Sequence, residues 1–142
     1  MELITTMIGG LIGTLVSVLW LAYANKFGFL PKEWRFFEDG VATLQKNSNR
    51  LLLYGPRFIL GGAILPVVFL YVWGPDGLLG ISIANSIVLS SLLLALIEFV
   101  LMTLGILLGA FKQPKNATIP LILVTLIGHL NLGFWIGIAA SM

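Results

Sequence analysis

Two ionisable side chains lie inside the longest apolar stretches of the chain. Glu98 is the single charged residue within residues 86–111, and His129, the chain's one histidine, lies at the middle of residues 118–140. A carboxyl group and an imidazole can exchange a proton. A charged group at the centre of a membrane helix costs roughly 2.5 to 3.5 kcal/mol to insert, and such a residue is by default a candidate functional site. Glu98 therefore predicts a functional site inside the membrane.

The spacing of Glu98 and His129 predicts that they meet. A connector of about six residues, 112–117, joins the two apolar stretches, so we expect antiparallel neighbouring helices. At 1.5 Å rise per residue the depths of the two side chains differ by only about 3 Å. Small residues on the same faces allow close helix packing, so both groups should point at protein rather than lipid. Small residues are expected at the helix contacts. Gly105 and Gly109 share a helix face with Glu98, and Gly133 and Gly137 share one with His129. Gly9, Gly13 and Ser17 form such a face on the first apolar stretch.

Two interpretations of this polar pair remain open. In the first, Glu98 and His129 form a relay for protons or small cations halfway across the membrane. In the second, a hydrogen bond between them locks the hairpin or joins two subunits, and no ion moves. The side chains expected to assist a relay are Thr125, Asn131 and Ser91.

Most other chemistries lack the residues they need. The chain has no cysteine, which excludes disulfides, thiolate metal sites and cysteine nucleophiles. One histidine cannot supply both axial ligands of a bis-histidine haem. The apolar stretches also hold too few histidines and carboxylates to form a zinc or di-iron site. The apolar stretches contain no aspartate for a Ser-His-Asp triad, and no glycine-rich stretch ends in the GK[ST] of a phosphate-binding loop. We expect no cofactor, no metal and no nucleic-acid partner, and we favour a protein that is not an enzyme.

Composition predicts an all-α integral membrane protein. Hydrophobic residues make up 58% of the chain and charged residues 10%, and the mean hydropathy is +1.04. About 20 apolar residues cross the hydrocarbon core of a bilayer. We predict one membrane domain, residues 1–142, with four transmembrane helices in two antiparallel hairpins. The predicted spans are approximately residues 3–24, 54–73, 86–111 and 118–140.

The second and third spans show irregular features. Pro66 lies in the middle of the second span, where its missing N–H predicts a kink, and we expect Arg57 to extend to the membrane surface. A single straight helix over residues 77–111 would be about 52 Å long, too long for a bilayer. We therefore expect residues 77–85 to form an interfacial or re-entrant segment before the third span.

The basic residues predict the orientation. Six of the eight lie within residues 25–57 and two within residues 112–117. The positive-inside rule therefore predicts that loops 25–53 and 112–117 lie in the cytoplasm and both termini lie outside, and the expected membrane is the cell membrane. Loop 25–53 is also expected to hold an amphipathic helix in the headgroup plane, the alternative being a solvated connector. The apolar face of that helix would consist of Trp34, Phe37, Val41 and Leu44.

These expectations do not identify a single function, and they leave three classes of protein. Four helices leave little room to enclose a polar path, so we expect a homo-oligomer or a subunit of a larger membrane assembly. The first candidate is a transport protein in which Glu98 and His129 carry a proton or small cation. The alternative is a non-catalytic accessory or assembly subunit, and a membrane enzyme acting on lipid is the third.

Overall fold

The described part of the molecule is entirely helical apart from turns. The computed structural model describes residues 2–28, 55, 57–108 and 119–142. Three long helices, α1 (Glu2–Lys26), α5 (Ile87–Leu107) and α6 (Ile119–Ala140), surround a shorter helical segment. The described residues form no strand, so the prediction of an all-α protein is confirmed for them. The shorter segment consists of the π-helical turn η1 (Leu60–Ile64), α4 (Leu65–Val68) and the π-helical turn η2 (Phe69–Trp73).

Three of the four predicted spans have the length and apolarity to cross a membrane. These are Glu2–Ala24, Ile87–Gly105 and Ile122–Ala140, which indicates a membrane protein. The helix at the place of the predicted second span, Arg57–Trp73, is apolar but shorter in its described part. At 1.5 Å per residue it reaches about 25 Å, less than the hydrocarbon core of about 30 Å. Most of the predicted loop 25–53 with its amphipathic helix, and all of 112–117, lie outside the described residues.

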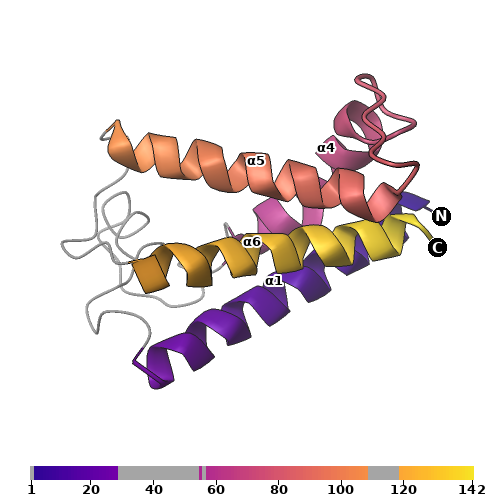
Figure 1. Ribbon diagram of the computed structural model, residues 1–142. Helices are drawn as coiled ribbons and strands as arrows, with labels where there is room; N and C mark the ends of the chain where they lie inside the picture. The colour runs from indigo at the N-terminus through magenta and orange to yellow at the C-terminus, as the bar shows by residue number, and fades with distance from the viewer. Residues whose placement is uncertain (1, 29–54, 56, 109–118) are drawn as a thin grey trace.

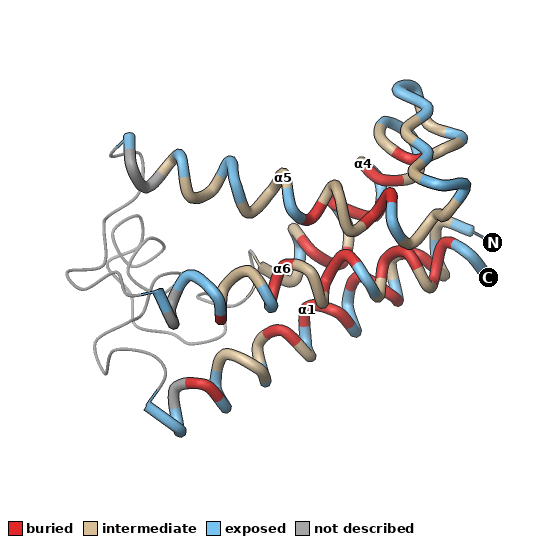
Figure 2. Tube along the Cα trace, viewed as in Figure 1, coloured by how far each residue is buried: buried red, intermediate tan, exposed pale blue. Residues whose placement is uncertain are grey.

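Helix α6 lies between α1 and α5 and contacts both (Figure 1). The short helix packs against α1 and reaches α5 through η2. Both termini and the turn 74–86 lie at one end of the bundle, and the buried residues gather towards that end (Figure 2). The core cluster joins the short helix to α6 and consists of Leu65, Phe69, Leu132, Ile136 and Ala140.

The helix around Pro66 has π-helical turns on both sides of the proline, and the kink predicted there stays a prediction. Proline cannot donate a backbone hydrogen bond, so the pattern must change near it. The Leu65 N–H donates to the Leu60 carbonyl, five residues back, and the Gly74 N–H donates in the same way to the Phe69 carbonyl. The helix therefore continues past the proline, with a hydrogen bond to a residue five back at the end of each π-helical turn.

Residues 74–86 fold back on the short helix instead of extending α5. The N–H groups of Leu78 and Leu79 donate to the carbonyls of Tyr71 and Val72. These bonds satisfy carbonyl groups in the last turn of the helix, which have no donor within the helix. The Ser86 hydroxyl accepts a bond from the Leu89 N–H and caps α5. The helix therefore starts at Ile87, and the preceding residues form a separate segment.

Candidate functional site

Glycines allow α1 and α6 to approach closely. A Cβ atom added at Gly9 would lie 2.6 Å from the Trp135 carbonyl oxygen, and one added at Gly13 would lie 3.1 Å from the Leu132 Cα. Both distances are too short for a side chain without local movement. Gly9 and Gly13 therefore lie at the contact between the two helices, as does Ser17 one turn further along.

Polar side chains at this α1–α6 interface bond across it. The Ser17 hydroxyl donates to the Gly128 carbonyl at 2.7 Å. Asn131 Nδ2 donates to the Gly13 carbonyl at 3.2 Å and to Ser17 Oγ at 3.1 Å. The structure thus places Asn131, which the sequence groups with the relay, on the face of α6 that contacts α1, where it joins the two helices.

The opposite face of α6 packs against α5 through a second pair of glycines. A Cβ atom at Gly133 would lie 2.6 Å from Ala95 Cβ and 2.8 Å from the Ser91 carbonyl oxygen, and one at Gly137 would lie 2.7 Å from Val88 Cα. The Ser91 hydroxyl donates a hydrogen bond to the Gly133 carbonyl. Ser91 therefore joins α5 to α6. Of the other predicted contact residues, Gly105 is half-buried and Gly109 lies outside the described residues.

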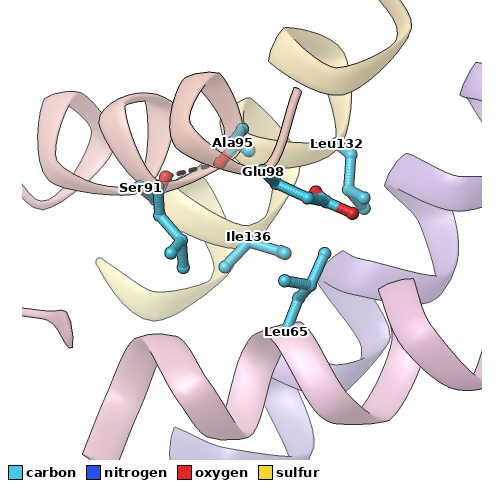
Figure 3. Close-up of a pocket in the computed structure, with 8 residues that line it drawn as sticks. Leu65, Ser91, Ala95, Glu98, Leu132 and Ile136 are labelled. Carbon is cyan, nitrogen blue, oxygen red and sulfur yellow. Dashed lines mark hydrogen bonds between the residues drawn. The ribbon is translucent and has the colours of Figure 1, made fainter. Parts of the chain in front are cut away.

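Glu98 extends from α5 into a small pocket between three helices. Figure 3 shows its carboxyl group pointing between Leu132 of α6 and Leu65 of the short helix. The pocket has about 10 Å³ of free volume, the lower limit for a single water molecule. Its lining residues are Leu65, Ser91, Leu94, Ala95, Glu98, Leu132, Gly133 and Ile136.

One oxygen of this carboxyl group lacks a hydrogen-bond partner. Glu98 Oε2 is buried, and no described residue donates to it. A buried polar atom left in this state costs about 1 to 3 kcal/mol, and more when it is charged. Such an atom requires an explanation, and a bound proton, ion or water molecule would supply one.

His129 is 9% exposed and is held by its own helix. Its Nδ1 lies 2.8 Å from the Thr125 carbonyl oxygen. A carbonyl only accepts, so Nδ1 carries the hydrogen, and the neutral imidazole has Nε2 as its proton acceptor. The ring packs edge-on against Phe99, the neighbour of Glu98, with centroids 5.6 Å apart. Thr125 therefore acts on His129 through its backbone and sets the tautomer.

Glu98 and His129 lie at the same level of the bundle without a direct bond. Along the antiparallel pair, Gly137 lies against Val88 and Gly133 against Ala95, so the next turn brings His129 beside residues 98–99. The described residues show no hydrogen bond or ion pair that joins the two head groups. Their predicted level agrees with this register, whereas a direct contact between them stays a prediction.

Arg57 is a third ionisable residue at this level. The short helix runs parallel to α6, with Gly61 against Leu132 and Leu65 in the same cluster as Ile136. Arg57 precedes Gly61 by one turn and so falls at the level of His129. Its charge interacts with both Glu98 and His129.

Sequence reasoning did not group Arg57 with Glu98 and His129. It expected the Arg57 side chain to extend to the membrane surface, and that expectation stays a prediction. The described helix here is Arg57–Trp73, and residue 55 before it is also helical.

A scan against protein-family models, a search of curated proteins and a search of solved structures each found no match for this chain. The function is therefore argued from the site. Its defining features are the buried carboxyl group of Glu98, the Nε2 acceptor of His129 and the nearby charge of Arg57.

Proposed function

We propose that this protein moves protons or small cations across a membrane and that Glu98 binds the ion. The observation that carries the proposal is the buried Glu98 Oε2, which has no hydrogen-bond donor among the described residues. His129 lies at the same level and offers Nε2 as a proton acceptor. A carboxyl group that binds an ion reversibly must be able to lose it, and Arg57 lies at the same level of the bundle, where a positive charge can stabilise a carboxylate.

The proposed topology has four crossings, with both termini outside the cell membrane and loops 25–53 and 112–117 in the cytoplasm. The short helix 57–73, together with residues before it, makes the second crossing. Support comes from the common position of the termini and turn 74–86 at one end of the bundle (Figure 1) and from the basic residues in the other two loops.

Cysteine labelling tests this topology. The chain has no cysteine of its own, so single cysteines at Ser48 and Asp76 give unambiguous signals. An impermeant reagent added outside intact cells should label Asp76→Cys and leave Ser48→Cys unlabelled until the membrane is opened. Labelling of Ser48→Cys from outside would overturn the topology.

The proposed working unit is a homo-oligomer or a subunit of a larger membrane assembly. The glycine stripes at Gly9 and Gly13 and at Gly133 and Gly137 are used within the chain, so they do not serve a second subunit. The face of α5 that points away from α6 is apolar and exposed, with Leu101 61% exposed. That face is available to lipid or to another subunit.

Flux into liposomes tests the transport proposal. The purified protein should dissipate an imposed ion gradient, and Glu98→Gln should reduce the initial rate at least tenfold, with His129→Ala also reducing it. Ser17→Ala is the matched control, because it alters a polar residue of the α1–α6 interface. Absence of flux in the wild-type protein, or full flux in both Glu98→Gln and His129→Ala, would overturn the proposal.

A non-catalytic accessory subunit is the second candidate. It is favoured by the bonds of Ser91 and Asn131, because both side chains donate to backbone carbonyls across a helix interface. Polar residues used in this way hold helices together. An accessory subunit should migrate with a partner on native gels in mild detergent, whereas a stable monomer that shows flux argues against it. No observation on the described residues favours an enzyme that acts on lipid.

A further inference from the structure

The donor atoms around Glu98 restrict the kind of ion that the pocket can hold. Its side-chain oxygen atoms come from Glu98 and Ser91 alone, and its other lining residues are apolar or glycine. A metal cation that leaves water needs several oxygen ligands in place of its hydration shell. Among the described residues no group of three or more His, Cys, Asp or Glu side chains could hold a metal ion.

Backbone carbonyls do not make up the missing ligands. Membrane sites for alkali cations use carbonyls from unwound helix segments or from loops. Helices α5 and α6 run without interruption past Glu98, so their carbonyls accept bonds within the helices. The Gly133 carbonyl, which faces the pocket region, also accepts from the Ser91 hydroxyl.

A proton has none of these requirements, since it needs one lone pair. We propose that the ion carried at Glu98 is a proton and that Arg57 is the positive charge that stabilises the carboxylate after the proton has left. This inference rests on the proposed function and specifies its ion. Binding forms an O–H bond at the carboxylate and neutralises it. Release breaks that bond, leaves the electron pair on oxygen, and passes the proton to water or to Nε2 of His129, while Arg57 remains charged throughout.

Few other groups compete for this role. The short helix contributes Arg57 at this level, and its remaining titratable residue, Tyr71, is exposed four turns away. Helix α6 contributes His129 alone, and α5 has no titratable residue besides Glu98. Helix α1 has none between Glu2 and Tyr23. Among the residues that the structure describes, Arg57 and His129 are therefore the titratable groups at the level of Glu98.

Ion substitution tests the identity of the ion. Liposomes holding the protein receive, in separate runs, an inward gradient of protons, sodium or potassium, with choline as the replacement cation. A pH-sensitive dye and isotopic sodium and rubidium report uptake. Proton uptake should proceed at the same rate in choline as in sodium, and alkali-metal uptake should not exceed that of empty liposomes.

The outcomes separate this inference from the proposed function. Sodium or rubidium uptake that Glu98→Gln abolishes would overturn the proton assignment and leave the transport proposal intact. No uptake of any of these ions would overturn the transport proposal itself.

The pH profile of flux tests the role of Arg57. Removal of its charge should let Glu98 hold its proton to higher pH, so Arg57→Gln should move the half-maximal point of proton flux upward by about one pH unit or more. Arg57→Lys should restore the wild-type profile. An unchanged profile in Arg57→Gln would overturn the assignment. If Arg57→Gln does not fold, the double variant Glu98→Gln, Arg57→Gln should fold, because both charges are removed together. Failure of the double variant to fold would also overturn the assignment of Arg57.

Discussion

The two faces of α6 differ in how their polar groups are satisfied. On the face towards α1, Ser17, Trp20 and Asn131 all donate to carbonyls or hydroxyls across the interface. On the face towards α5, Ser91 bonds in the same way, but one oxygen of Glu98 remains buried without a donor. The comparison separates polar residues that join helices from a carboxyl oxygen that has no donor among the described residues, and the proposed ion site is based on that oxygen.

The energies of the two arrangements support this distinction. A hydrogen bond between membrane helices contributes about 0.6 kcal/mol on average, so the bonds towards α1 give a modest net stabilisation. An unsatisfied buried oxygen costs about 1 to 3 kcal/mol. The buried carboxyl group of Glu98 is therefore expected to lower the stability of the bundle. In the proposed function, this carboxyl group gains and loses a proton.

The strongest test of this contrast is Glu98→Gln. Glutamine keeps the size of the side chain and cannot ionise, so proton flux should fall at least tenfold while thermal stability in detergent stays the same or rises. Initial rates from a pH-sensitive dye and a melting curve measure the two quantities. If Glu98→Gln lost stability and kept its flux, Glu98 would hold the helices together and would not bind the ion.

A steric change at the α5–α6 contact should mainly affect stability. Gly133→Ala places a Cβ atom 2.6 Å from Ala95 Cβ, so we expect a loss of about 1 to 3 kcal/mol. Gly128→Ala is the matched control on the same helix, because its Cβ would meet only Trp20 Cδ1 at 4.0 Å. Unfolding in a detergent titration, followed by circular dichroism, measures both variants. Equal stability of the two would contradict the close packing at Gly133.

His129→Ala should have an intermediate effect on flux. The variant removes the Nε2 acceptor but leaves the carboxyl group of Glu98, so the rate should fall severalfold and not to zero. Phe99→Leu provides a control for the lost ring contact, since it removes the edge-on packing and keeps the imidazole. A larger loss of flux in Phe99→Leu than in His129→Ala would mean that packing, and not proton transfer, is the contribution of His129.

Ser17→Ala should have the smallest effect. It removes the bond to the Gly128 carbonyl and the bond that Ser17 Oγ accepts from Asn131, at a cost of about 0.6 kcal/mol each, and it should leave flux unchanged. The same melting curves and dye assay apply. A marked loss of flux with normal stability would show that the α1–α6 interface also belongs to the ion path.

Sequence alone predicted the long helices and the small residues at which α1 and α6 pack, whereas the stripe expected on α5 at Gly105 and Gly109 stays a prediction. Length and apolarity were sufficient for α1, α5 and α6, because a membrane span depends on local composition. The spacing of Gly9, Gly13 and Ser17 by four residues gave one face of α1, since residues at that spacing share a face. These features are local, so they can be predicted without knowledge of the neighbouring helices.

The candidate site was only partly predictable because it depends on how helices are rotated and placed. Asn131 lies two residues after His129, and residues at that spacing point to different sides of a helix. That rule could have separated Asn131 from the relay, whereas Ser91, seven residues before Glu98, shares its face. Arg57 could not be placed from composition, because its depth depends on where the short helix packs against α6.

The most direct test of the central claim is an infrared titration of Glu98 in the folded protein. Spectra of the wild-type protein and of Glu98→Gln are recorded across a range of pH, so that the carboxyl groups common to both cancel in the difference. The account predicts one carboxylic-acid C=O stretching band, present in the wild type alone, that disappears as the pH rises. Difference spectra without such a band at any pH, or with a band that never titrates, would contradict the assignment of Glu98 as a reversible proton site.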